Sequence, residues 1–205
     1  MRELRALAVF CGSHAGRDAI HRAAAEELGR LLARRGVRLV YGGGRVGLMG
    51  ALADAALAAG GEVVGVIPRF LLDREVGHRG VTELVTVESM HERKAEIERR
   101  ADGFVALPGG IGTLEEIAEI WTWILLGLHA KPVGLLNSGG YFDPLIEFLD
   151  RMVEEGFLSA GYRALLQVER EPERLLERLA AAPPPPGAKW TGAEAPPPDG
   201  VARRG

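Results

Sequence analysis

Cysteine and lysine are scarce in this sequence. It contains one cysteine, Cys11, which excludes an internal disulfide and any zinc site built from several cysteines. Of its 25 basic residues only three are lysines, Lys94, Lys131 and Lys189. Chemistry through a lysine Schiff base therefore has few candidates, and no cluster with the spacing of metal ligands is visible.

Long apolar runs and a strong net charge are also absent. No run reaches the ~18 apolar residues of a transmembrane helix, and the first residues (MRELRALAVF) lack the pattern of a secretory signal. The net charge of −3 argues against nucleic-acid binding through a strong basic field. With 205 residues, 47% of them hydrophobic, the chain is large enough for one packed domain. We therefore expect a cytoplasmic protein that binds neither membranes nor nucleic acids.

Short apolar segments alternate with longer amphipathic ones, which predicts an α/β fold with a Rossmann-like open parallel sheet and helices on both faces. The pattern predicts strands at residues 4–11, 37–41, 62–67, 82–87, 103–107 and 132–136. It predicts helices at residues 17–35, 46–59, 89–100, 113–126, 143–155 and 172–181. Residues 1–181 would then form a single Rossmann-like domain, and the proline-rich residues 182–205 a disordered tail.

Glycine-rich segments follow several of these strands, where open parallel sheets bind ligands. Residues 42–47 (GGGRVG) match the dinucleotide pattern G-x-G-x-x-G. That pattern also needs an acidic residue at the end of the next strand, but the sequence there is Ile67-Pro68-Arg69. Three interpretations stay open: a dinucleotide site, a tight turn without ligand, and a mononucleotide-binding loop, which we favour.

A second glycine-rich segment, residues 107–116 (LPGGIGTLEE), joins a strand to a helix start and predicts an anion site. Thr113 can cap the helix and offer its hydroxyl to a phosphate. No Gly-Lys-Ser/Thr follows, so this is not a Walker loop. Glu116 has two interpretations, either the second member of a capping box with Thr113 or a carboxylate that stabilises a cationic transition state. Glu115 points about 100° away around the helix and is the weaker candidate.

Residues 89–96 (SMHERKAE) open the preceding helix. Ser89 and Glu92 have the spacing of a capping box. His91, Arg93 and Lys94 form either a solvated charged face or a phosphate clamp, because arginine binds phosphate bidentately.

Together these motifs resemble the LONELY GUY (LOG) family of cytokinin riboside 5′-monophosphate phosphoribohydrolases, many of which are labelled lysine decarboxylases. The resemblance is carried by SMHxRK at 89–94 and PGGxGTxxE at 108–116, supported by CGS at 11–13, YGGGxxGLMG at 41–50 and KPVGLLN at 131–137. It covers about residues 4–180.

The resemblance implies hydrolysis of the N-glycosidic bond of a nucleoside 5′-monophosphate, without metal or cofactor, by a homodimer. It implies that Arg93 and Glu116 are catalytic. The substrate contacts that we carry over are Ser13, Gly43, Met49, Glu75, Arg93, Lys94, Gly109, Gly110, Ile111, Gly112, Thr113, Leu114, Glu115 and Thr122. Whether Arg93 neutralises phosphate or assists the leaving base stays open, as does the base preference, because Trp121 and Trp123 flank Thr122 where a smaller residue is expected.

The helix at 113–128 is apolar nearly all round, although one sheet face can bury only one stripe of it. We therefore expect it to form part of a homodimer interface. The alternative to the enzyme is a non-catalytic mononucleotide-binding protein of the same fold, since fold alone does not determine function.

Overall fold

The computed structural model describes residues 3–72 and 77–185. Within them, parallel strands form one sheet in the order β4-β3-β2-β1-β5-β6-β7. The strands are β1 (Ala6–Phe10), β2 (Arg38–Tyr41), β3 (Val63–Pro68), β4 (Glu83–Val87), β5 (Gly103–Ala106), β6 (Val133–Leu136) and β7 (Leu166–Glu169). The predicted Rossmann-like open parallel sheet is confirmed.

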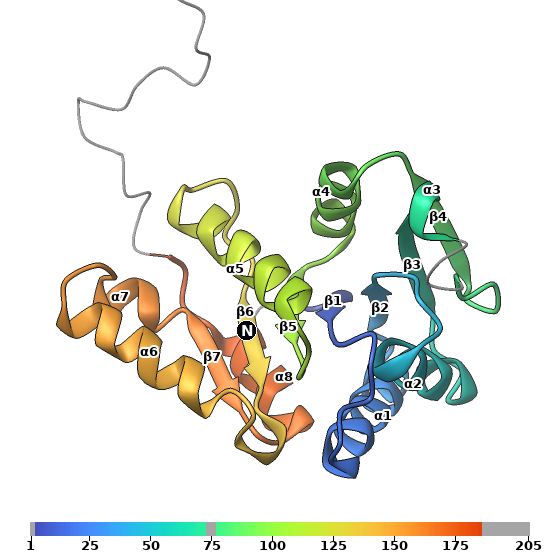
Figure 1. The fold of residues 1–205 in the computed structure, drawn as a ribbon, viewed down its shortest axis with the longest axis horizontal. Helices are drawn as coiled ribbons and strands as arrows, with labels where there is room; N and C mark the ends of the chain where they lie inside the picture. Colours follow the sequence, from blue (N-terminus) through green and yellow to red (C-terminus); the bar gives the residue numbers. More distant parts are fainter. Residues whose placement is uncertain (1–2, 73–76, 186–205) are drawn as a thin grey trace, which may run out of the picture.

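Helices cover both faces of this sheet (Figure 1). On one face lie α1 (Ala19–Arg34), α2 (Gly47–Ala58) and α8 (Pro172–Ala181). On the other lie α4 (Met90–Arg100), α5 (Ile111–Leu125), α6 (Asp143–Glu154) and α7 (Ala160–Arg163). The short helix α3 (Arg69–Leu72) directly follows β3, and a 3-10 turn (Ser138–Gly140) follows β6.

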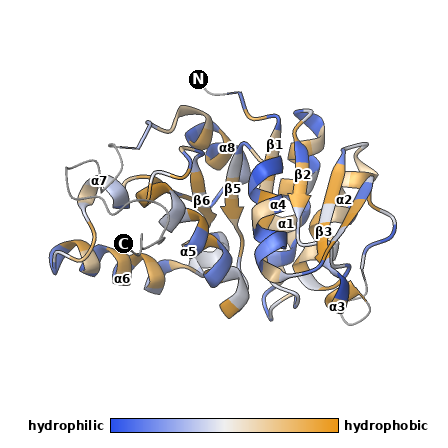
Figure 2. Cartoon of the chain, turned by 90° about the horizontal axis from the view of Figure 1, so that it is seen from above, coloured by the Kyte–Doolittle hydropathy of each residue, from blue (hydrophilic) through white to orange (hydrophobic). Residues whose placement is uncertain are grey.

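The sheet divides the core into two layers because strand side chains alternate between its faces. In β1, Leu7 and Val9 pack beneath α1 and α2, whereas Ala8 and Phe10 pack against α4 and α5. All residues of β1 are buried, and the central strands are almost uniformly hydrophobic in Figure 2. This burial on both faces explains their continuous apolar runs in the sequence.

The predicted strands and helices are all present, with ends shifted by a few residues. Within the described residues the sequence did not predict α3, α7, β7 or the 3-10 turn after β6. Strand β7 is a short strand at the sheet edge. Its second half, Val168 and Glu169, is only partly buried, so it lacks a strong apolar run. Most of the predicted tail lies outside the described residues. Among the described helices, none has the length and apolar character needed to cross a membrane.

The strand order positions the ligand site. Strands β1 to β4 extend the sheet in one direction, and β5 then returns to the other side of β1. The loops that leave β1 and β5 therefore diverge to opposite faces and leave a crevice between them, at the carboxyl ends of the strands. Gly12, Gly42 and Pro108 all follow strands at this edge.

Candidate active site

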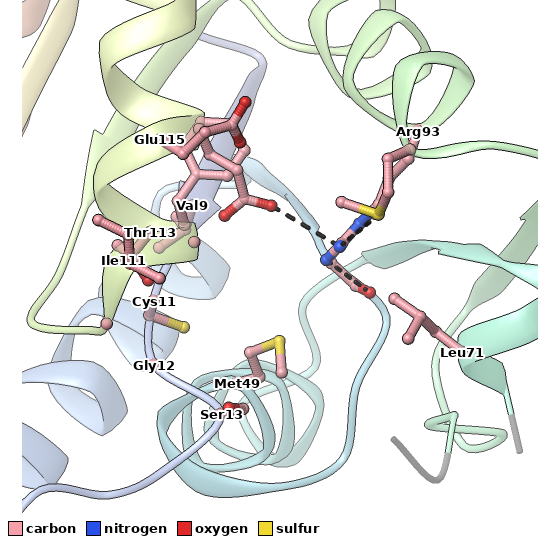
Figure 3. A pocket seen from close by; sticks show the side chains of 16 residues that line it. Val9, Cys11, Gly12, Ser13, Met49, Leu71, Arg93, Ile111, Thr113 and Glu115 are labelled. Atoms are coloured by element: carbon pink, nitrogen blue, oxygen red, sulfur yellow. Dashed lines mark hydrogen bonds and ion pairs between the residues drawn. The ribbon is translucent and has the colours of Figure 1, made fainter. Parts of the chain in front are cut away.

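A cavity of about 350 Å³ occupies this crevice (Figure 3). Its walls come from the ends of β1 and β2, from the first turns of α2, α3 and α4, and from the N-cap and first two turns of α5. The lining residues are Val9, Phe10, Cys11, Gly12, Ser13, Gly42, Met49, Leu71, Met90, Arg93, Gly110, Ile111, Gly112, Thr113, Glu115 and Glu116.

Arg93 reaches into the cavity from the first turn of α4. Its side chain is 8% exposed, and its Nη2 donates a hydrogen bond to the carbonyl of Gly42 at 3.2 Å. Its Nη1 lies 3.7 Å from Oε1 of Glu116 and 3.8 Å from the sulfur of Met90. The buried Nε has no hydrogen-bond partner among the described residues. Burying such a donor is costly, so Arg93 is suited to receive an anionic or polar ligand group.

The helix that holds Arg93 in place begins as predicted. Ser89 caps α4, its Oγ accepting a hydrogen bond from the amide of Glu92 at 3.1 Å. The Glu92 carboxylate accepts from the amide of Glu88 at 2.9 Å, one residue before the position expected for a capping box. Glu92 therefore has a structural role here.

Glu116 projects into the cavity from α5, where its side chain is 11% exposed. The predicted capping box with Thr113 is wrong. Helix α5 begins at Ile111 with Gly110 as its N-cap, so Thr113 is already inside the first turn and Glu116 lies in the second. Thr113 mimics a cap in the sequence, but the real cap has no side chain. Of the two interpretations of Glu116, the one based on capping is therefore eliminated.

The start of α5 forms the wall of the cavity that is suited to an anion. The amides of its first turn have no intrahelical carbonyl to bond, and the helix dipole is positive there. A Cβ added at Gly110 or Gly112 would meet no atom within 4 Å, so ligand atoms have room beside this backbone. The loop before it is fixed by the Tyr141 hydroxyl, which donates to the carbonyl of Gly109 at 2.6 Å.

Two glycines allow the site to form. A Cβ at Gly42 would clash with the Arg93 guanidinium. Gly47 has φ +58°, and a Cβ there would clash with the backbone of Ser13 and His14. Gly42 thus allows the Arg93 guanidinium, and Gly47 the loop after β1, to pack closely against residues 42–47.

Apolar side chains line the side of the cavity away from the α5 start. Met49 lies at its floor on α2, and Leu71 faces it from α3 (Figure 3). Met90 lies beside Arg93. Cys11 is buried at the end of β1, where burial, followed by the charge of Glu116, raises the pKa of its thiol well above the ordinary value. Cys11 is therefore a neutral lining residue, and it lies near Ile111 and Thr113 rather than beside Leu71 (Figure 3).

The structure brings together most of the predicted site residues. The cavity is lined by the predicted residues Ser13, Met49, Arg93, Gly110, Ile111, Gly112, Thr113, Glu115 and Glu116. Gly109 lines an adjoining cavity of about 410 Å³, which shares Gly12, Ser13 and Gly110 with the first.

Other predicted contacts lie away from this cavity. Gly43, Lys94, Leu114 and Thr122 do not line it. The backbone carbonyl of Gly43 accepts a hydrogen bond from the amide of His78 at 2.9 Å. The Thr122 hydroxyl donates to the carbonyl of Ala118 at 2.7 Å.

His91 of the proposed phosphate clamp is exposed, and Glu75 lies outside the described residues.

Several lining residues were missed in the sequence. Cys11, Gly12 and Gly42 stand at strand ends within the quoted motifs, and that position could have identified them as lining residues. No sequence signal pointed to Leu71, because α3 itself was not predicted. Met90 has the pattern of an ordinary helix residue.

The donor set does not fit a metal or a Schiff-base cofactor. Among residues 3–72 and 77–185 there is no group of three or more His, Cys, Asp or Glu side chains that could hold a metal ion. Lys94 and Lys131 are each ion-paired, to Glu115 and Glu98, and neither lines the cavity. Neither is placed to carry the pyridoxal phosphate that a lysine decarboxylase would need. Lys189 lies outside the described residues.

Comparison with solved structures shows the fold. The molybdenum cofactor carrier protein of Chlamydomonas reinhardtii superposes with a TM-score of 0.63 at 22% identity, covering 87% of this chain and 99% of that one. The molybdenum cofactor binding protein of Rippkaea orientalis gives 0.65 at 21% identity, covering 88% and 98%. At these identities the likeness extends to the fold alone.

Sequence comparisons show the family. A family model described as "Possible lysine decarboxylase" matches residues 49–179. The cytokinin riboside 5′-monophosphate phosphoribohydrolase LOG of Oryza sativa subsp. japonica is 52% identical over 162 residues, which are 79% of this chain and 67% of that protein. LOG1 of Arabidopsis thaliana is 46% identical over 177 residues, 86% and 83% of the two chains. This chain belongs to the family of the LOG cytokinin riboside 5′-monophosphate phosphoribohydrolases.

Proposed function

We propose that the chain hydrolyses the N-glycosidic bond of adenine nucleoside 5′-monophosphates, including N6-modified ones, in the cytoplasm. The products are the free base and ribose 5-phosphate. The observation that carries this proposal is the position of the buried Arg93–Glu116 pair, 3.7 Å apart, beside the phosphate-type start of α5.

The spacing along α5 suits a ribose 5-phosphate. With a rise of ~1.5 Å per residue, Glu116 lies about 6 Å along the helix from Gly112. A phosphate on the first-turn amides then places the sugar beside the Glu116 carboxylate. The base extends toward the apolar wall of Met49, Leu71 and Met90.

The residues then divide the reaction between them. The bond from C1′ to the base breaks with its electron pair leaving on the base, and positive charge develops on the ribose. The Glu116 carboxylate stabilises this charge and orients the water that adds to C1′. The water proton ends on the departing base. Phosphate binding at Gly112 and Thr113 supplies remote binding energy that positions the sugar.

A substrate panel tests the proposal. Purified protein without added metal is incubated with AMP, isopentenyl-AMP, other nucleoside monophosphates and adenosine, and released base is measured by chromatography. We expect base and ribose 5-phosphate in equal amounts from adenine monophosphates and far slower cleavage of adenosine, because the phosphate contacts are lost. Binding of AMP without base release would support the non-catalytic alternative. Equal cleavage of adenosine and AMP would contradict the phosphate site.

We also propose that the chain acts as a homodimer with α5 in the interface. Leu126, the C-cap of this helix, and Leu128 in the turn that follows are 47% and 68% exposed, and Trp121 and Trp123 on the helix are only half-buried. Aromatic and aliphatic side chains of this kind are typical interface anchors.

Light scattering coupled to size exclusion should give twice the 22.0 kDa chain mass. Leu128→Glu should shift the protein toward monomer. Ile20→Glu is the matched control, since Ile20 is an exposed apolar residue on α1, on the other face of the sheet. A wild-type monomer with full activity at micromolar concentration would overturn the dimer.

A further inference from the structure

Lys94, next to Arg93 on α4, forms ion pairs with two carboxylates of α5. Its Nζ lies 2.5 Å from Oε1 of Glu115 and 2.7 Å from Oε2 of Glu119. The lysine side chain is 7% exposed. Burial alone would lower the pKa of this ammonium, but the hydrogen bonds and charges of Glu115 and Glu119 raise it. Lys94 is therefore a fixed cation between two anions.

The position of this cluster ties it to the catalytic pair. Glu115 and Glu119 are four residues apart, so they lie on one face of α5, and without a cation between them they would repel each other. Lys94 does not line the cavity, whereas Arg93 and Glu116 both do. Arg93 directly precedes Lys94 on α4, and Glu116 directly follows Glu115 on α5. The ion pairs of Lys94 therefore join the same two helices that carry the catalytic pair.

We propose that Lys94 is a positioning residue that locks α4 against α5 and so sets the distance between Arg93 and Glu116. The inference rests on the proposed hydrolase function. It differs from the role that the family resemblance implies, in which Lys94 touches the substrate. Insertion of the ammonium between Glu115 and Glu119 fixes how far α4 can slide along α5. A slide would change the 3.7 Å separation of Arg93 and Glu116 directly.

The test compares steady-state kinetics on AMP for the wild-type protein and a set of single and double variants. Lys94→Met keeps the length of the side chain and removes its charge. Glu119→Gln removes a partner that does not line the cavity. The double variant Lys94→Glu/Glu119→Lys keeps the same three charges with the cation moved to α5, and Lys94→Glu is its reference. Lys131→Met is the matched control, because Lys131 tethers the other end of α4 through Glu98 at 2.6 Å.

A positioning role predicts a particular split of kcat and KM. In Lys94→Met, kcat should fall about 10²-fold, as a displacement of ~1 Å at a reacting pair can cause, with KM little changed. Glu119→Gln should lower kcat in the same direction, and combining it with Lys94→Met should add little. The relocated-charge variant should recover most of the kcat lost in Lys94→Glu. Lys131→Met should keep the wild-type kcat.

Several outcomes would overturn the inference. A raised KM with unchanged kcat in Lys94→Met, together with a silent Glu119→Gln, would make Lys94 a substrate ligand. An equal loss of kcat in Lys131→Met would show general loosening of α4. If Lys94→Met fails to fold, Glu119→Gln alone decides between these results. Absence of base release by the wild-type protein would instead overturn the proposed function itself, and the inference with it.

Discussion

Replacing Gly42 with alanine should disable the site while leaving the fold intact. The Gly42 backbone does not have positive φ, so alanine fits its conformation. The new methyl group would clash with Nη2 of Arg93, which is the far end of a flexible side chain and can move aside. The protein therefore tolerates the change by displacing the guanidinium.

The expected cost follows from that displacement. Ordinary van der Waals contact at a Cβ begins at 3.4 Å, so the guanidinium must retreat and its 3.2 Å hydrogen bond to the Gly42 carbonyl is lost. A displacement of about 1 Å at a reacting group costs about 10²-fold in rate, which is about 2.7 kcal/mol of activation free energy. The lost hydrogen bond costs the folded state about 1 kcal/mol, and the restriction of the unfolded chain by alanine offsets about as much, so the free energy of unfolding should change little.

Base release from AMP and thermal unfolding, measured on the same preparation, test this reasoning. Gly112→Ala is the companion variant, because its Cβ meets no atom within 4 Å and does not approach Arg93. Its methyl group enters the space assigned to the phosphate, so KM should rise while kcat changes less. A Gly42→Ala protein with wild-type kcat would refute the placement of Arg93 in the machinery.

Three further predictions concern the elements around the site. Ser89→Ala removes the cap of α4 and should lower the free energy of unfolding by about 1 kcal/mol in denaturant titrations; an unchanged midpoint would contradict the cap. Because burial raises the pKa of the Cys11 thiol, native protein at neutral pH should react with a thiol reagent far more slowly than unfolded protein, by mass spectrometry, and equal rates would contradict its burial. Burial lowers the pKa of His129 below its ordinary 6.5, so the unfolded state binds that proton first as the pH falls. The free energy of unfolding should therefore decrease below pH 6.5, and His129→Gln should weaken this dependence; identical pH profiles would count against it.

The elements buried on both faces were predictable from sequence, and those at the margins were not. Strand β1 is a continuous apolar run because every one of its residues is buried. Strand β7 lies at the sheet edge and carries Gln167, whose amide bonds the carbonyl of Ala164 at 2.9 Å, so no strand pattern appears there. Helix α5 was predicted to start late, because a glycine N-cap leaves no signal while Thr113 imitates one.

The same distinction applies to the site. Arg93 and Glu116 stand out because they sit in motifs at strand ends, and the structure brings them to 3.7 Å. Lys94 looks equivalent to Arg93 in sequence, but one step along a helix turns a side chain by about 100°. That rotation sends Lys94 to Glu115 and Glu119 instead of the cavity, and only the packing of α4 beside α5 reveals it.

The measurement that tests the account most directly is base release from AMP by the Glu116→Gln variant beside the wild-type protein. Glutamine keeps the shape of the side chain and removes its charge, and the corrected start of α5 leaves it no capping role to lose. We expect adenine release by the wild type and a fall of about 10²–10⁴-fold in kcat for the variant at a temperature where both proteins are folded. A folded Glu116→Gln protein with near-wild-type turnover would contradict the account.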